Sequence, residues 1–138
     1  MEEKPMIHVA AAVVRRGGRY LLTRRPDGSH QGGFWEFPGG KLEEGETAAE
    51  ALVREGREEL GVELRVGPLV RRFTHRYPER DVDLWFFEAE FADGVPRPIE
   101  VAELGWFGPS EMAALPILPA DLVVVEELSR REAGGGAR

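Results

Sequence analysis

Apolar and polar positions follow two different periodicities along this chain, and together they predict a mixture of strands and helices. The segments expected to be strands are rich in β-branched, aliphatic or aromatic residues and cover 7–14, 20–23, 34–37, 62–70, 72–77, 82–91 and 101–107. A break at Gly67-Pro68 is expected inside the fourth of these segments, and the glycine-rich stretch 26–33 is expected to be a loop.

Helical propensity is concentrated in three other segments, 48–60, 109–115 and 120–131. The first has the clearest boundaries. Thr47 and Glu50 have the spacing of a capping box, and Gly61 is a natural C-terminal stop. Two principal helices among many strands predict an α/β sandwich around a mixed sheet. A single domain is expected over residues 1–132, followed by a glycine-rich tail, 133–138, that is expected to be disordered.

Composition narrows the classes of protein to consider. The chain has 138 residues, 42% of them hydrophobic, which suits one domain with one core. No apolar run approaches the roughly 20 residues that span a bilayer, and no signal peptide precedes the first strand. Cysteine is absent, so no disulfide or thiolate zinc site is possible. We therefore expect a soluble, cytoplasmic protein.

The formal charge of −7 disfavours binding to a nucleic-acid polymer, but not binding to a small polyanion when metal ions supply positive charge locally. No membrane partner is expected. Many of the acidic residues fall between positions 43 and 63. Among them, Glu55, Glu58 and Glu59 have the spacing that places three carboxylates on one patch of a helix. Like charges at this spacing destabilise a helix slightly. Either the patch is a solvated surface, or a hard divalent cation such as Mg²⁺ occupies it.

The residues that flank the three glutamates favour the metal. Gly40, Glu46, Arg54-Glu55, Glu58-Glu59 and Gly61 follow one another at spacings that resemble the Nudix box, a motif that here spans residues 40 to 62. The one departure is Gly56, where the family usually has a bulkier aliphatic residue. Glycine inside a helix costs about 1 kcal/mol relative to alanine. The resemblance implies the Nudix fold, an α/β/α sandwich around a mixed sheet.

The resemblance also implies roles for the motif residues. Glu55, Glu58, Glu59 and the carbonyl group of Gly40 are expected to hold Mg²⁺, or else Mn²⁺, that is bound to a nucleoside diphosphate group. Glu55 is in addition the candidate to orient or deprotonate the attacking water. Glu46 is expected to be a supporting carboxylate. Arg54 is expected to brace the site through an acidic neighbour, although an ordinary surface ion pair with Glu50 or Glu58 would use the same residue.

Beyond the box, the chain is similar to the MutT branch of the family, which hydrolyses 8-oxo-dGTP to the monophosphate and pyrophosphate. Cytidine triphosphate pyrophosphohydrolases share several of the same segments. The similarity spans about residues 7 to 128 and rests on these segments: 22–25, 35–41, 77–80, 84–86 and 118–121. By this resemblance Glu100, six residues before Trp106, is expected to be a further acidic group near the metal. A glutamate in such a loop is more often inert.

The same resemblance assigns a substrate site. Arg25 is expected to contact phosphate with its guanidinium fork, or to be only a surface arginine. His30 either closes over the nucleotide or is solvated. The residues expected to line the base pocket are Phe37, Tyr77, Arg80 and Val82, of which Phe37 and Val82 fit a core equally well.

Asp121 departs from the MutT pattern, which has asparagine here. An ionised aspartate only accepts hydrogen bonds, which suits the N1–H and N2 amine of guanine and equally the N4 amine of cytosine. The leading prediction is therefore a Mg²⁺-dependent nucleoside triphosphate pyrophosphohydrolase with 8-oxo-dGTP as substrate. A (d)CTP or 5-methyl-dCTP pyrophosphohydrolase is the alternative.

Two further readings belong to other classes of protein. One is a Nudix-fold binding or sensor module without catalysis, although such modules generally lose the glutamates that this chain retains. The other is a lesion-recognition domain of a DNA glycosylase, against which the −7 charge counts. Whether the chain is a monomer or a homodimer is left open by the sequence.

Overall fold

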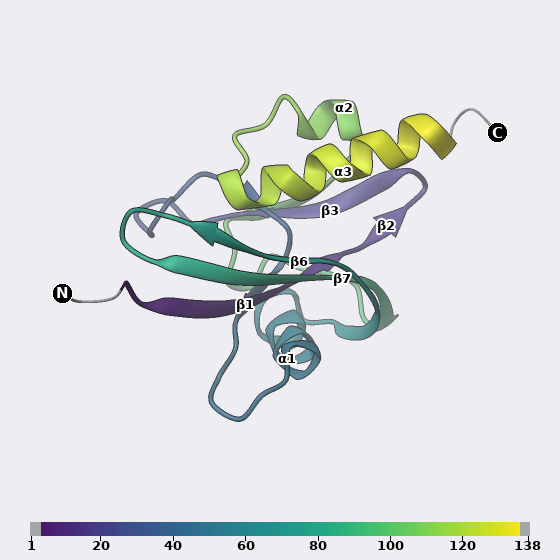
Figure 1. Cartoon of the computed structure of the whole chain (residues 1–138). Coiled ribbons are helices and arrows are strands. Elements are labelled where there is room, and N and C mark those ends of the chain that lie inside the picture. The colour runs from purple at the N-terminus through teal and green to yellow at the C-terminus, as the bar shows by residue number, and fades with distance from the viewer. Residues whose placement is uncertain (1–3, 136–138) are drawn as a thin grey trace.

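The computed structural model describes residues 4–135. Eight strands and three helices follow one another in these bounds: β1 Met6–Val13, β2 Arg15–Arg16, β3 Arg19–Arg24, β4 Trp35–Glu36, β5 Gly39–Lys41, α1 Ala48–Leu60, β6 Glu63–Arg76, β7 Asp81–Asp93, β8 Glu103–Phe107, α2 Pro109–Met112 and α3 Pro119–Gly135. They form the expected α/β/α arrangement, in which α3 and α2 lie on one side of the sheets and α1 on the other (Figure 1).

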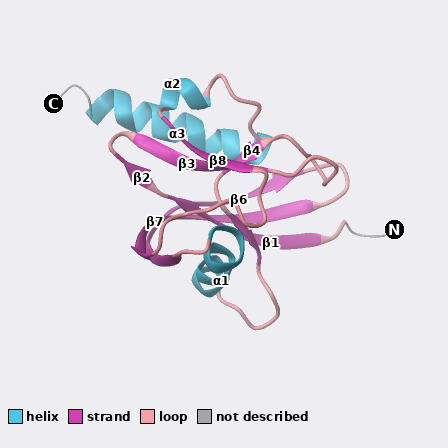
Figure 2. Cartoon of the chain, turned by 180° about the vertical axis from the view of Figure 1, so that it is seen from behind, coloured by secondary structure: helices cyan, strands magenta, loops and turns pink. Residues whose placement is uncertain are grey.

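Two sheets make up the middle of the molecule. The first has the order β5-β1-β7-β6 and is mixed, because β1 pairs parallel with β7 and antiparallel with β5. In the second, β3 pairs with β2, β4 and β8, all antiparallel. Figure 2 shows the two sheets edge-on between the helices. The prediction of a mixed sheet inside an α/β sandwich is thus confirmed.

Each face of the first sheet has its own apolar core. Ala11, Leu84 and Phe86 face α3, together with Leu22 from the second sheet and Val124 from the helix. The alternate residues of the same strands face α1, and this second core includes Ala10, Ala12, Leu52 and Leu60. A strand with apolar side chains on both faces must lie in the middle of the molecule, and this is where β1 and β7 lie.

The start and the end of α1 are fixed by the signals that the sequence carries. Thr47 Oγ1 accepts from the N–H of Glu50 at 3.1 Å, and the Glu50 carboxylate accepts from the N–H of Thr47 at 2.8 Å. Gly61 adopts the left-handed conformation, with φ of 69°, and its N–H donates to the carbonyl of Arg57. The helix therefore spans residues 48–60 as predicted.

Gly56 lies on the buried side of α1, where a Cβ would meet Leu64 Cδ1 at 2.8 Å and Cγ at 3.0 Å. The Leu64 side chain thus occupies the space that a bulkier residue at position 56 would need. The departure from the family motif is in this way compensated by packing from β6.

Two expectations about strands and termini need correction. Residues 62–70 and 72–77 do not form two strands, because β6 runs unbroken from Glu63 to Arg76. Its pairing with β7 shifts between Val66 and Leu69, so the Gly67-Pro68 break is a β-bulge. The last helix, α3, continues to Gly135, so the described part of the expected tail, 133–135, is helical. Residues 136–138 of that tail lie outside the described residues.

Candidate active site

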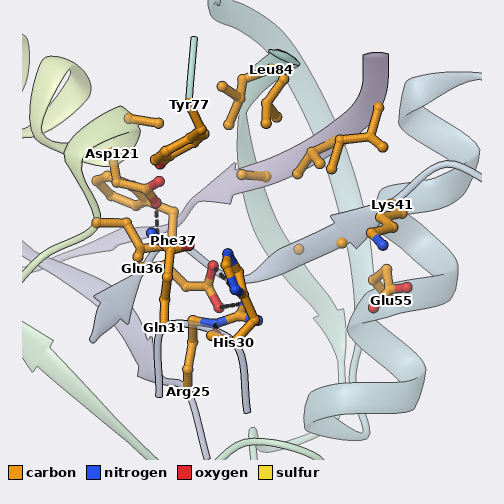
Figure 3. A pocket seen from close by; sticks show the side chains of 18 of the residues that line it. Arg25, His30, Gln31, Glu36, Phe37, Lys41, Glu55, Tyr77, Leu84 and Asp121 are labelled. Atoms are coloured by element: carbon orange, nitrogen blue, oxygen red, sulfur yellow. Dashed lines mark hydrogen bonds and ion pairs between the residues drawn. The ribbon is translucent and has the colours of Figure 1, made fainter. Parts of the chain in front are cut away.

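A cavity of about 330 Å³ opens between β1, the 26–33 loop, the β6–β7 connection and the start of α3. All six residues expected to bind substrate line it, and so does the predicted pocket residue Val82; the six are Arg25, His30, Phe37, Tyr77, Arg80 and Asp121. Gly40, Glu55 and Glu59 of the motif line the same cavity. Figure 3 shows Asp121 and Tyr77 on one side of it, and Lys41 and Glu55 on the other.

The carboxylate end of the cavity is built by the contact between β5 and α1. Gly40 pairs with Ala10 of β1, and its Cα lies against the carboxyl group of Glu55. A Cβ on Gly40 would fall 2.6 and 2.7 Å from the two carboxylate oxygens of Glu55. Gly39 is similarly close to β1, since a Cβ there would lie 2.8 Å from Ala11 Cα. Gly40 thus leaves room for the Glu55 carboxyl group, and Gly39 lets β5 lie close to β1.

Negative charge accumulates at this end. Burial raises the pKa of Glu59 to about 8, and the nearby carboxylates of Glu55 and Glu36 add to the rise. Burial likewise raises the pKa of Glu55, against the opposing effect of Arg54. The negative charge of Glu100 raises the pKa of both groups by a smaller amount, and the N–H of Glu100 donates to the Glu59 carbonyl at 3.4 Å. A bound cation would relieve this crowding of carboxylates.

Arg54 connects the acidic residues around the cavity. Its Nε donates to Glu46 at 2.7 Å, and its Nη1 donates to Glu55 at 2.8 Å and to Glu58 at 2.9 Å. Its Nη2 also donates to the Lys41 carbonyl. Arg54 therefore does more than form the surface pair with Glu50 or Glu58 that was the alternative; the Glu50 carboxylate is used by the cap of α1.

The structure does not place every expected ligand inside the cavity. Glu46, Arg54, Glu58 and Glu100 stand outside its lining. Within residues 4–135, no three histidine or acidic side chains are arranged to hold a metal ion by themselves. Mg²⁺ suits such a site, since it usually binds through one or two carboxylates and keeps waters or phosphate oxygens as its other ligands. Glu55 and Glu59, with the Gly40 main chain beside them, fit that requirement.

The opposite end of the cavity has a second pair of acidic groups. Asp121 is only 4% exposed, and its Oδ2 accepts from the N–H of Phe37 at 2.8 Å. Burial, and after it the neighbouring Glu36, raise the pKa of Asp121 well above its usual value. Burial also raises the pKa of Glu36, although Arg25 opposes this with a hydrogen bond at 3.1 Å.

Arg25 has partners within the protein, and its expected contact with phosphate stays a prediction. Its Nε donates to the carbonyl of His30 at 2.8 Å and its Nη1 to Glu36. In this structure Arg25 therefore holds the 26–33 loop and Glu36 in place at the wall of the cavity. Phe37 serves both roles that were considered, because it lines the cavity and packs edge-to-face on Phe86 in the core.

Three polar residues of the lining were not expected from the sequence: Gln31, Glu36 and Lys41. Glu36 carried a signal that could have revealed it, since it is a lone charged residue between the aromatic Trp35 and Phe37. A buried carboxyl group in such a run needs a partner, and Arg25 provides it. Gln31 lies in a loop of polar residues and glycines, where the sequence has no periodicity that separates it from its neighbours.

Comparison with known proteins identifies the family. The family model described as NUDIX domain matches residues 9–127. The CTP pyrophosphohydrolase of Escherichia coli (strain K12) is 40% identical over 121 residues, which cover 88% of this chain and 90% of that protein. The 8-oxo-dGTP diphosphatase of Proteus vulgaris is 43% identical over 88 residues, 63% of this chain and 79% of that protein. The chain belongs to the NUDIX domain family.

Its place in the family is with the MutT-like hydrolases. The crystal structure of the MutT protein from Methanosarcina mazei Go1 matches with a TM-score of 0.82 and 27% identity, over 96% of this chain and 99% of that one. The predicted Nudix fold and MutT-like resemblance are confirmed. Among residues 4–135, no helix is long and apolar enough to cross a membrane.

Proposed function

We propose that this protein is a Mg²⁺-dependent nucleoside triphosphate pyrophosphohydrolase that removes an oxidised nucleotide such as 8-oxo-dGTP from the cytoplasmic nucleotide pool, and so protects DNA. One observation carries the proposal. A single cavity has the motif glutamates at one end and a buried pair of acidic groups, Glu36 and Asp121, at the other. A nucleotide with its phosphates at Glu55 and Glu59 places its base beside Asp121.

The charged residues that line the cavity explain why a cation is needed to bind a triphosphate. The cavity is lined by four acidic residues, two at each end, and by the basic residues Arg25, Lys41 and Arg80. Because Arg25 is engaged by Glu36, an anionic triphosphate would meet an excess of negative charge at the glutamate end. When bound there, Mg²⁺ neutralises the phosphate oxygens and polarises the bond to be broken.

The residues of the chain supply the remaining chemistry. The Glu55 carboxylate accepts the proton of the attacking water, whose oxygen forms the new bond to phosphorus while the phosphoric anhydride bond breaks. Arg54 holds Glu55 and Glu46 in place through three short hydrogen bonds. The products are the nucleoside monophosphate and pyrophosphate.

Burial favours the form of Asp121 that can donate a hydrogen bond, which the ionised form cannot do. Burial raises the pKa of Asp121 and so favours the protonated carboxyl group, which donates as well as accepts. A protonated aspartic acid thus resembles the asparagine of the MutT pattern. This supports an oxidised purine as the substrate.

A cytidine nucleotide is the second candidate, and two observations favour it. The Escherichia coli relative named CTP pyrophosphohydrolase covers 88% of the chain. The pair of acidic groups at the base end, Glu36 and Asp121, also suits the N4 amine of cytosine as an acceptor.

The decisive experiment measures pyrophosphate release with Mg²⁺ from a panel of normal and oxidised nucleotides, and compares kcat/KM for 8-oxo-dGTP, dCTP and 5-methyl-dCTP. The proposal expects 8-oxo-dGTP to be hydrolysed best. A protein that releases no pyrophosphate from any nucleotide, or a Glu55→Gln variant with undiminished turnover, would contradict hydrolysis by this site.

A further inference from the structure

Gln31 has an unusual backbone. Among residues 4–135 it is the one non-glycine residue with a positive φ, 55°. A residue with a Cβ is strained in this left-handed conformation, which glycine adopts freely. Glycines stand close by at positions 28, 32 and 33, so the chain places a side chain where glycine would be less strained. Strain of this kind persists where the surrounding structure enforces it, and it concentrates at functional sites.

The peptide groups on both sides of Gln31 are held in place. Arg25 Nε donates to the carbonyl of His30 at 2.8 Å, and the N–H of Phe34 donates to the carbonyl of Gln31 at 3.3 Å. At the base of the loop, the N–H of Gly33 donates to the carbonyl of Arg25 at 2.9 Å. The direction of the Gln31 side chain is therefore set by the loop and by Arg25.

That direction leads into the cavity. The Gln31 side chain lines it from the 26–33 loop, and Tyr77 lines it from the β6–β7 connection. The two side chains are close enough to interact, because Gln31 lowers the pKa of Tyr77 against the larger effect of burial. Figure 3 labels Gln31, Tyr77 and Asp121 among the residues that line this cavity. Gln31 thus places an amide group in the cavity that also holds the acidic pair.

The chemistry of an amide complements that of the acidic pair. Glu36 is bonded to Arg25 and can only accept, while one oxygen of Asp121 is occupied by the Phe37 N–H. Nucleobases carry acceptors next to their donors, such as N3 and O2 beside the cytosine amine or O6 beside guanine N1–H. The amide NH₂ group of Gln31 has two N–H donors, so it can donate to such an acceptor from the wall of the cavity.

We propose that Gln31 is a specificity-determining residue, whose amide NH₂ group donates to a ring acceptor of the bound base beside the group read by Asp121. The inference rests on the proposed function, since it requires a nucleotide whose base enters this end of the cavity. The Nudix box does not imply this role, because Gln31 lies outside residues 40 to 62.

The experiment compares Gln31→Glu, Gln31→Ala and Gln31→Gly by steady-state kinetics on the nucleotide panel. Gln31→Glu keeps the size of the side chain and replaces its NH₂ by an oxygen. For the preferred nucleotide we expect Gln31→Glu and Gln31→Ala to raise KM about tenfold with kcat nearly unchanged, and to reduce the preference between bases by a similar factor. Gln31→Gly is the backbone control, since it removes the side chain and also relieves the strain.

A Gln31→Gly variant that loses preference as Gln31→Ala does supports a role of the side chain. If it keeps the wild-type preference, the position serves the backbone alone and the inference is overturned. Tyr77→Phe tests the remaining route. Were Gln31 to act only by holding Tyr77, this variant would reproduce the full loss of Gln31→Ala, which would also overturn the inference.

The two hypotheses fail in different ways. A wild-type enzyme that hydrolyses no nucleotide removes the proposed function itself. An active wild type whose Gln31→Glu and Gln31→Ala variants keep the ratio of kcat/KM values between bases within twofold refutes only the role of Gln31. Thermal unfolding of each variant shows whether it is folded, and Gln31→Gly is expected to be the most stable of the three.

Discussion

The carboxyl group of Glu55 lies directly against the Cα of Gly40. Strand β5 and helix α1 therefore touch at the first residue of the motif. A methyl group on residue 40 would fall 2.6 and 2.7 Å from the Glu55 oxygens. The glycine of the motif is therefore explained by space, in addition to the carbonyl ligand that the family resemblance implies.

Gly40→Ala is expected to displace the Glu55 carboxyl group and reduce kcat at least about tenfold, a loss of the size that follows when a reacting group is moved by a fraction of an ångström. Pyrophosphate release under saturating substrate measures it. Gly134→Ala is the matched control, because a Cβ at that position in α3 meets nothing within 4 Å. Equal turnover in the two variants would mean that Glu55 tolerates a new position.

Arg54→Lys is expected to reduce kcat by about 10- to 100-fold, the loss typical of a residue that orients catalytic ligands. The planar guanidinium of Arg54 donates to Glu46, Glu55 and Glu58 at the same time. A lysine ammonium is a compact group that lacks this planar fork of donors and cannot reproduce the arrangement. Arg57→Lys, one turn along the same helix, is the control, since Arg57 pairs with the exposed Glu63. A full retention of kcat in Arg54→Lys would reduce Arg54 to a surface residue.

Replacement of the buried Asp121 and of the buried Asp83 is expected to change Tm at pH 7.5 in opposite directions. Because the pKa of Asp121 is raised in the folded protein, its contribution to stability is complete below the unfolded pKa, near 4, and is lost as pH rises towards the folded value. Asp121→Asn should therefore raise Tm at pH 7.5, and the gain should vanish near pH 4.

Asp83 is the matched case. Hydrogen bonds from Arg72 first, and also from His8 and Trp85, lower the pKa of Asp83 to about 2. Its contribution, about 2 kcal/mol, is present above the unfolded pKa and is lost as pH falls towards 2. Asp83→Asn should then lower Tm at pH 7.5 and progressively less below pH 4. Thermal unfolding from pH 3 to 8 measures both variants, and equal signs would contradict this electrostatic account.

Metal removal tests the crowding of carboxylates around Glu59. EDTA is expected to abolish turnover and added Mg²⁺ to restore it. In the absence of substrate, Mg²⁺ should also raise the Tm of the wild type, because it binds the folded state alone. The rise should shrink in Glu59→Gln and persist in Glu63→Gln, whose residue pairs with Arg57 outside the cluster. The same rise in both variants would place the metal elsewhere.

The sequence predicted the elements whose cause is local. Helix α1 begins and ends at the predicted residues, because Thr47, Glu50 and Gly61 act on the backbone beside them. The strands of the central sheet were recognisable because β1 and β7 carry apolar side chains on both faces. The course of β6 was mistaken, since Gly67-Pro68 interrupts the local pattern while hydrogen bonds to β7 continue on both sides of the bulge.

What the sequence by itself determined is the chemistry of the motif. The fixed spacing from Gly40 to Gly61 identifies Glu55, Glu58 and Glu59 as candidate ligands before any fold is known, since residues on one helix keep their relative positions. Tertiary structure alone decided which other residues meet them. Gln31, Glu36, Tyr77 and Asp121 come from four separate segments, and Asp121 is a raised-pKa acid only because folding buries it beside Glu36. Burial and long-range electrostatics depend on the whole packed chain, so Gln31 and Glu36, and the raised pKa of Asp121, became visible only in the folded molecule.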